Sequence, residues 1–264
     1  MISYNKMSKE ELLNEKEAME KKYSEFKALG YNLNMSRGKP CTQQLDLSAG
    51  LMNVLGEKDF KDEDGFDLRN YGILDGIPQA KKLFAEVLGV TPDKIIVGGN
   101  SSLNLMYDTI ARAMLFGVPG SKMPWSKQDN IKFLCPVPGY DRHFAVTKEF
   151  GIEMINVPMT SEGPDMDVIE KLVADDASIK GIWCVPLYSN PDGITYSEET
   201  CKRFASMKTA AEDFRIMWDN AYCVHHLSDD NQDSVPDIID LCEKEGNPDR
   251  VFVFASTSKI TWAG

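Results

Sequence analysis

From residue 78 onward the chain alternates between amphipathic stretches and short apolar runs. The amphipathic stretches repeat their apolar residues at helical spacing, and the apolar runs are rich in Val, Ile and Phe, as buried strands are. The pattern predicts helices over residues 78–89, 101–117, 141–151, 165–176, 197–213 and 235–246. It predicts strands over residues 94–99, 131–136, 152–158, 179–186, 214–219 and 250–256.

This alternation is typical of βαβ units. We therefore predict an α/β fold with a mainly parallel sheet sandwiched by helices. Ligands of such sheets bind outside the carboxyl ends of the strands. The polar residues that follow the predicted strands are therefore the first candidates for a site.

A separate charged helix precedes this region. Ser8 and Glu11 have the spacing of a capping box at its start, and Gly30 is a typical helix stop. Residues 32–40 are expected to be extended, and residues 51–77 are mixed and partly solvated.

The composition narrows the class of protein. The 264 residues carry a net charge of −12, and without a basic block this argues against nucleic acid and anionic membranes as partners. No apolar run approaches a membrane span, and the N-terminus has no secretory signal. The six cysteines include no CxxC pair, which favours reduced thiols in a cytoplasmic protein over a zinc site.

Most of the predicted strands are followed by residues whose side chains can bind a ligand or take part in catalysis. They are Asn100, Ser101, Ser102, Tyr140, Asn190, Asp219, Tyr222 and Lys259. Each also has an ordinary explanation: Ser101 or Ser102 could serve only as a helix N-cap, Tyr140 could be a turn residue, and the lysine could be solvated. There is no GxGxxG or GxxxxGK[ST] motif, which argues against a dinucleotide fold and a P-loop.

Taken together, these residues match the needs of pyridoxal phosphate. A helix N-terminus suits the phosphate, an aromatic side chain the ring, and a carboxylate the protonated ring nitrogen. Hydrogen-bond donors suit the ring 3-oxygen, and a lysine suits the aldehyde.

The order of the motifs resembles the fold-type I aminotransferases, in particular a bacterial branch of the aspartate aminotransferase family. "SNPDG" is similar to the family's Asn-Pro-x-Gly element, "WDNAY" to its Asp-x-x-Tyr element, and "ASTSK" to its Schiff-base signature. "NYGILDG" is similar to a Tyr-x-x-x-x-Gly stretch that precedes the first helix of the large domain. The resemblance covers residues 30–264.

The resemblance implies a role for each candidate. Lys259 would form the Schiff base and move the proton, and Asp219 would pair with the ring nitrogen. Asn190 and Tyr222 would bind the 3-oxygen, and Tyr140 would stack on the ring. The phosphate would be held by Asn100, Ser101, Ser102 and Ser256, and by Tyr71 of the neighbouring subunit in a homodimer. Gly38 would lie close to the substrate carboxylate.

The resemblance also implies a domain plan. Residues 1–50 would be an N-terminal helix and arm belonging to a small domain, and residues 51–264 would be the cofactor-binding large domain. The family's phosphate-binding arginine lies several residues beyond the lysine, and a C-terminal small domain follows it. Neither is present before Gly264, so we expect the large domain to be incomplete and the C-terminal small domain to be absent.

The function implied is transfer of an amino group between an amino acid, by resemblance aspartate-like, and a 2-oxo acid. Two alternatives remain open. One is a β-lyase or decarboxylase with the same fold, because the motifs indicate the cofactor more clearly than they indicate the reaction. The other is a cofactor-binding regulatory protein without turnover. His225 and His226 are adjacent and cannot face one site from a strand, so we favour a structural role, or support of a residue of the site, over a metal site.

Overall fold

The computed structural model describes residues 4–34 and 40–263. The chain divides into two compact units, Met1–Leu47 and Ser48–Gly264. Gly38, the predicted neighbour of the substrate carboxylate, lies outside the described residues. No helix among the described residues is long and apolar enough to cross a membrane.

The first unit contains the predicted charged helix. Helix α1 spans Lys9–Ala28, and Ser8 and Glu11 form the expected capping box at its start. Gly30 has a φ of 65°, a left-handed conformation that glycine adopts without strain and that stops the helix. The unit also contains the short helices η1 (Tyr4–Lys6) and α2 (Thr42–Asp46).

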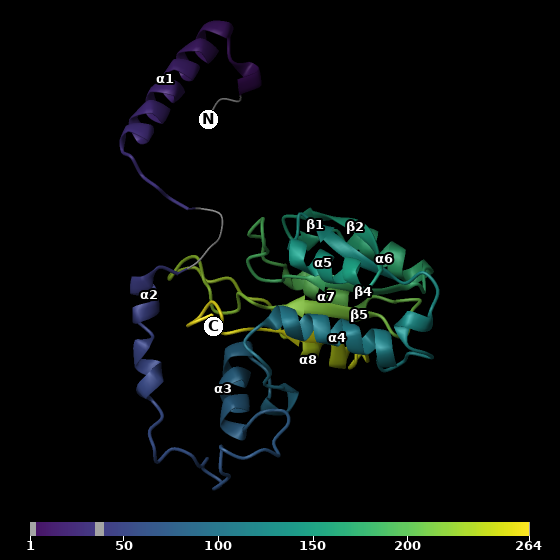
Figure 1. Ribbon diagram of the computed structural model, residues 1–264. Coiled ribbons are helices and arrows are strands. Elements are labelled where there is room, and N and C mark those ends of the chain that lie inside the picture. Colours follow the sequence, from purple (N-terminus) through teal and green to yellow (C-terminus); the bar gives the residue numbers. More distant parts are fainter. Residues whose placement is uncertain (1–3, 35–39, 264) are drawn as a thin grey trace. The chain divides into compact units, whose positions relative to one another are not determined.

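The second unit is built on one six-stranded sheet (Figure 1). Its strands are β1 (Lys132–Val137), β2 (Glu153–Thr160), β3 (Gly163–Pro164), β4 (Ile179–Cys184), β5 (Arg215–Asp219) and β6 (Val251–Phe254). The order is β3-β2-β1-β4-β5-β6, and every pair is parallel except β2–β3. The chain therefore reverses its direction across the sheet between β1 and β4, and such a switch point opens a crevice at the carboxyl ends of the two strands.

Helices cover both faces of this sheet: α4 (Ser102–Phe116) and α5 (Asp141–Glu149) pack on one face, and α6 (Met166–Asp175), α7 (Glu198–Ser206) and α8 (Ile238–Lys244) on the other. Helix α3 (Pro78–Leu88) and the short turns η2 (Ala49–Asn53), η3 (Pro92–Lys94) and η4 (Trp125–Lys127) also belong to this unit, and α3 contacts η3. Alternate strand residues supply two separate cores. Leu134, Ile182 and Ile216 pack with α6, α7 and α8 in one core, whereas Phe133 and the other intervening residues pack with α4 and α5. The predicted α/β sandwich is confirmed.

The strand predicted over residues 94–99 is wrong. Residues 92–94 form the turn η3, and residues 95–99 have no regular structure. The Val97 N–H bonds the Asp75 carbonyl at 2.9 Å instead of a strand, and Ile96 is 78% exposed. An apolar run becomes a strand only where another strand can pair with its backbone, and none of the described strands lies against this one.

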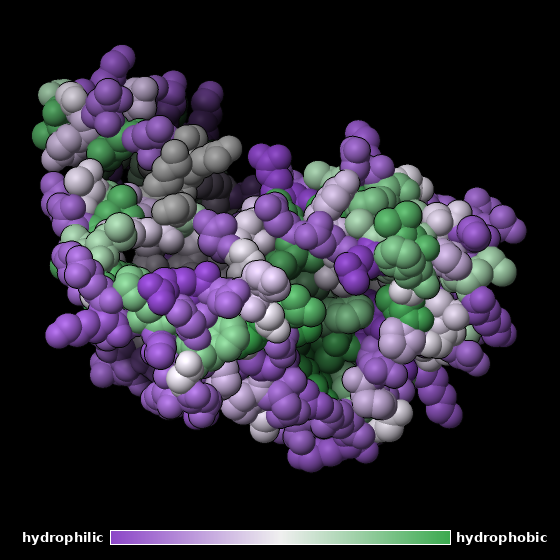
Figure 2. Space-filling view, turned by 60° about the horizontal axis from the view of Figure 1, so that its bottom comes forward, coloured by the Kyte–Doolittle hydropathy of each residue, from purple (hydrophilic) through white to green (hydrophobic). Residues whose placement is uncertain are grey.

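An apolar cavity of about 310 Å³ separates this segment from β6, the last strand of the sheet. Ile95, Leu105, Val253 and Phe254 are among the side chains that line it. Figure 2 shows a hollow with hydrophobic side chains at its floor on the side of the molecule where α3 and α8 lie in Figure 1. The segment and β6 therefore face each other across a gap instead of forming a ladder.

Two other elements differ from the pattern. The helix predicted over residues 197–213 ends at Ser206, because the following residues turn inward and the Ala210 N–H bonds the Val173 carbonyl at 2.7 Å. Tertiary contacts here override helical propensity. The two-residue strand β3 was not expected, since it is too short to show a period.

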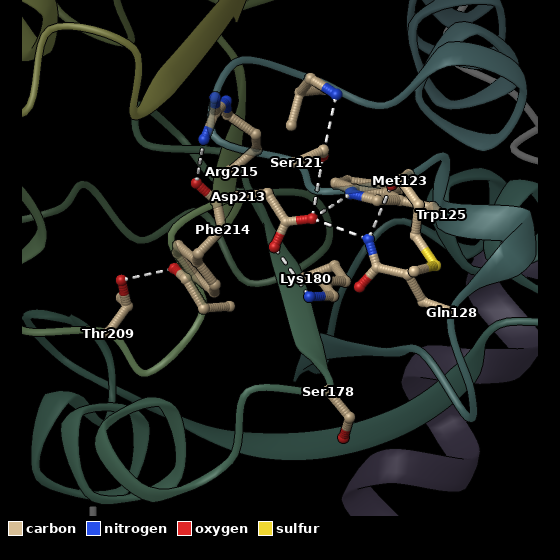
Figure 3. A network of polar contacts seen from close by, with 12 residues as sticks. Ser121, Met123, Trp125, Gln128, Ser178, Lys180, Thr209, Asp213, Phe214 and Arg215 are labelled. Carbon is tan, nitrogen blue, oxygen red and sulfur yellow. Dashed lines mark hydrogen bonds and ion pairs between the residues drawn. The ribbon is translucent and has the colours of Figure 1, made fainter.

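The inward turn delivers Asp213 to a buried network at the amino end of the sheet (Figure 3). Its Oδ1 accepts a hydrogen bond of 2.7 Å from Lys180 Nζ. Its Oδ2 accepts from Ser121 Oγ at 2.9 Å, Gln128 Nε2 at 3.0 Å and Trp125 Nε1 at 3.1 Å. One carboxylate thus joins residues 121–128 to β4 and to the start of β5.

Candidate functional site

The predicted residues gather at the opposite, carboxyl edge of the sheet. Asp219 is the last residue of β5, and Tyr140 is the N-cap of α5, three residues after β1. Tyr140 and Asn190 both line a small cavity at the switch point between β1 and β4. The folding of four parallel strands therefore brings together residues that are far apart in the sequence.

Asp219 is a buried carboxylate with one oxygen engaged and one free. The residue is 5% exposed, and Oδ2 lies 2.9 Å from Nε2 of His143. Oδ1 is buried and has no hydrogen-bond partner among the described residues. A buried, unpartnered carboxylate oxygen is costly, so this atom suits a ligand that brings a positively charged N–H group.

His143 is the functional neighbour that sequence reasoning missed. It lies on α5 and is 1% exposed, and its ring stacks on Trp183 with centroids 4.6 Å apart and planes 12° apart. The Tyr140 ring lies nearly perpendicular to the imidazole, with centroids 5.0 Å apart and planes 87° apart. A histidine in the first turn of a helix that begins at the carboxyl edge is a signal that could have identified it, because its three-residue distance from Tyr140 places both on one helix face.

Asn190, Tyr222 and Lys259 form a second group at this edge. Burial raises the pKa of the Tyr222 phenol, and a hydrogen bond from the Asn190 side chain partly opposes the shift. The negative charge of Asp219 also raises the pKa of Tyr222. The Lys259 Nζ lies 4.8 Å from the centroid of the Tyr222 ring, within range of a cation–π contact.

The predicted phosphate residues meet at the start of α4. Ser101 is the N-cap, and its Oγ accepts from the Asn104 N–H at 3.3 Å, so the ordinary reading of this serine as a cap holds. Ser102 is the first helical residue. Ser256, just after β6, donates to the Asn100 carbonyl at 2.8 Å and so joins the end of the sheet to the helix N-terminus. Free N–H groups and the dipole of this helix favour an anion.

One predicted residue, Tyr71, does not join this cluster. The Tyr71 side chain is 94% exposed, in the irregular stretch before α3. Gly38 lies outside the described residues. Of the two histidines without an assigned role, His226 Nδ1 lies 3.2 Å from the Tyr188 hydroxyl, and His225 Nδ1 is buried without a partner among the described residues.

The fold and this edge define a helix-covered, mainly parallel α/β domain whose carboxyl edge carries a helix N-terminus, a buried carboxylate and a lysine. A family model for the aspartate amino-transferases matches residues 7–264, and the chain belongs to this family. It is 49% identical over 248 residues to the aspartate aminotransferase of Corynebacterium glutamicum, a match that covers 94% of this chain and 57% of the relative.

Solved structures agree with this assignment. A crystal structure of an aspartate transaminase from Corynebacterium glutamicum matches with a TM-score of 0.90 and 47% identity, over 100% of this chain and 62% of that one. The α-aminoadipate aminotransferase LysN of Thermus thermophilus, complexed with N-(5'-phosphopyridoxyl)-L-leucine, shares the fold at 19% identity and a TM-score of 0.60, over 85% of this chain and 52% of that one. The chain spans 62% and 57% of the lengths of two curated relatives, from Mycolicibacterium smegmatis and Corynebacterium glutamicum.

Proposed function

We propose that this chain carries the cofactor-binding domain of a pyridoxal-phosphate-dependent aminotransferase that moves an amino group between an aspartate-like amino acid and a 2-oxo acid. The observation that carries the proposal is the Asp219 carboxylate. His143 holds its Oδ2, and its buried Oδ1 is left for the protonated ring nitrogen of the cofactor. Opposite charges at close range favour both ionised forms.

The remaining residues fit the other parts of the cofactor. Asn190 and Tyr222 would hold the ring 3-oxygen, and Tyr140 would stack on the ring. The N-terminus of α4 and the nearby hydroxyls would bind the phosphate. These phosphate residues are Asn100, Ser101, Ser102 and Ser256. Bound pyridoxal phosphate supplies an electron sink for the electrons at the substrate Cα.

Lys259 is the proposed covalent anchor of the cofactor aldehyde and the base that carries the proton. Its amine lies beside Tyr222 at the same edge as Asp219. Lysine is the side chain that can condense with an aldehyde through its primary amine, and the same Nζ atom can accept a proton when it is free. The other phenol and amide groups at this edge orient the ring but cannot take this role.

The proposed enzyme is a cytoplasmic homodimer. All six cysteines are free thiols, which fits a reducing compartment. The exposed Tyr71 would reach the phosphate bound to the partner subunit, and Gly38 would lie near the substrate carboxylate. We further propose that residues 51–264 are an incomplete large domain. The free edge of β6 and the apolar cavity beside it support this, because each leaves backbone or apolar surface uncovered.

The test uses two proteins, the 264-residue chain and a chimera that continues it with the C-terminal part of the Corynebacterium glutamicum relative. Each is incubated with pyridoxal phosphate, then with aspartate, then with 2-oxoglutarate. We expect the visible absorbance of the bound cofactor in the chimera to bleach with aspartate and to return with 2-oxoglutarate, and glutamate to form.

The same assay separates the alternatives. Release of pyruvate or CO₂ without glutamate would support the β-lyase or decarboxylase, which keeps the cofactor but changes the reaction. Stable cofactor binding with no spectral response to any amino acid would support a regulatory protein. A chimera that folds but never binds the cofactor would refute the proposed function.

A further inference from the structure

We propose that Trp183 is a positioning residue that holds the His143 ring in the orientation that places Nε2 on Asp219. Trp183 lies on β4, and its partners His143 and Thr147 lie one helical turn apart on α5. All three side chains are almost completely buried. The consequence for catalysis rests on the proposed function, but the positioning itself does not.

Two kinds of contact join Trp183 to α5. Its indole ring is nearly parallel to the imidazole of His143, with centroids 4.6 Å apart. Its Nε1–H donates to Thr147 Oγ1 at 2.8 Å, and Thr147 Oγ1 donates in turn to the His143 carbonyl at 3.0 Å. The strand and the helix are therefore joined by a closed set of contacts around the imidazole.

The Trp183 ring is itself fixed in place. Phe133 on β1 contacts it, with ring centroids 5.6 Å apart. Gly181, on the same face of β4, leaves room for Phe133, because a Cβ at that position would lie 2.3 Å from Phe133 Cζ. The indole has one hydrogen-bond donor, and Thr147 accepts from it. Rotation of the Trp183 ring would break this hydrogen bond.

These contacts determine what the imidazole can do. Rotation of the His143 ring about its Cβ–Cγ axis would drive it against the indole face and against the Tyr140 ring, whose centroid lies 5.0 Å from that of the imidazole. The ring therefore stays with Nε2 toward Asp219 Oδ2, and next to a carboxylate oxygen the tautomer that carries its proton on Nε2 is favoured. That choice leaves Oδ1 as the free oxygen of Asp219.

The experiment observes the imidazole directly. The 264-residue chain has three histidines, so ¹⁵N labelling of histidine gives three resolvable side-chain spin systems in long-range ¹H–¹⁵N spectra. We expect His143 to show one tautomer with a slowly exchanging Nε2–H. In Trp183→Leu we expect its nitrogen shifts to move toward the average of the two tautomers and the Nε2–H to exchange at least about tenfold faster, as buried hydrogen bonds do when their surroundings loosen.

A matched control removes the general effect of losing a core indole. Trp125 belongs to the same hydrophobic core and its Nε1–H also has a partner, but no ring contact joins it to His143. Trp125→Leu should destabilise the chain and leave the His143 signals unchanged. Equal changes in both variants, or no change in Trp183→Leu, would overturn the proposal.

A second pair keeps the test informative if Trp183→Leu fails to fold. Thr147→Val removes the acceptor of the indole N–H with little change of shape, and Thr147→Ser restores it. We expect the first to loosen His143 and the second to rescue it, and identical spectra of the two would refute the role of this contact. Because no step needs the cofactor, failure of cofactor binding would count against the proposed function and not against this inference.

Discussion

His143 Nε2 lies 2.9 Å from Asp219 Oδ2, and both side chains are withdrawn from solvent. The two residues are 76 positions apart in the sequence, and the sheet joins them by placing α5 next to the end of β5. The contact uses one oxygen of the carboxylate and leaves the other buried and free. This division of the two oxygens is the main reason that we assign a cofactor to this edge.

The first prediction concerns the stability that this contact provides. His143→Phe should lower the free energy of unfolding by about 1–3 kcal/mol, because it leaves a second buried carboxylate oxygen without a partner. Urea unfolding measures the change. His225→Phe is the matched control, since the Nδ1 of His225 has no partner to lose among the described residues. Equal losses in the two variants would show that the hydrogen bond contributes nothing.

The second prediction concerns the charge of Asp219. Asp219→Asn in the chimera should keep cofactor binding but lower the transamination rate at least about a hundredfold, because a neutral amide no longer favours the protonated ring. Asp219→Glu should lose less, since the charge remains. Steady-state kcat is the measurement. A near-normal rate for the asparagine variant, with only about 1 kcal/mol of stability lost, would identify Asp219 as a simple turn cap.

How much of this site the sequence predicts depends on how its residues are placed. Asp219 and Ser101 each end a strand or begin a helix, so the period of apolar residues locates them. His143 lies in the first turn of α5, so its place near this edge follows from the helix start, but its contact with Asp219, 76 positions away, does not. Such a pairing depends on tertiary structure and is invisible to local patterns.

The same distinction explains why two of the elements predicted from the sequence are wrong. Residues 94–99 have the composition of a strand, but a strand also needs a neighbour to pair with, and composition does not report one. Residues 207–213 have helical propensity, but the burial of Asp213 beside Lys180 determines their path. In both places, contacts distant in sequence decide the local structure.

The third prediction is the pH dependence of the Asp213 network. Burial opposes ionisation of this carboxyl, but hydrogen bonds from Lys180, Gln128 and Ser121 outweigh it and hold its pKa below the usual value. A depressed pKa stabilises the fold above the unfolded value of 3.8, and this contribution is lost as the pH falls through the lower folded pKa.

Asp213→Asn should therefore cost about 3–5 kcal/mol near pH 7, because it leaves a buried lysine without its counter-ion. The difference from the parent should narrow as the pH falls below 3.8, the value in the unfolded chain. Urea unfolding across this range tests the sign. Asp229→Asn, at an exposed position, is the control, and a difference for Asp213→Asn that stays constant with pH would contradict the prediction.

The fourth prediction concerns the exposed Tyr71. If this side chain completes the phosphate site of a partner subunit, Tyr71→Ala and Lys259→Ala in the chimera should each be nearly inactive as separate homodimers. Mixing and refolding them together should restore part of the activity, since hybrid dimers contain one site with both native residues. A fully active monomer, or a mixture no more active than its components, would refute a shared site.

We propose that Lys259 is the covalent partner of the cofactor, at the same edge of the sheet as Asp219. The most direct measurement is borohydride reduction of the protein with bound pyridoxal phosphate, followed by peptide mapping. We expect a phosphopyridoxyl group on the peptide that contains Lys259, and its loss together with the visible absorbance in Lys259→Ala. A phosphopyridoxyl group found mainly on another lysine would refute the role of Lys259.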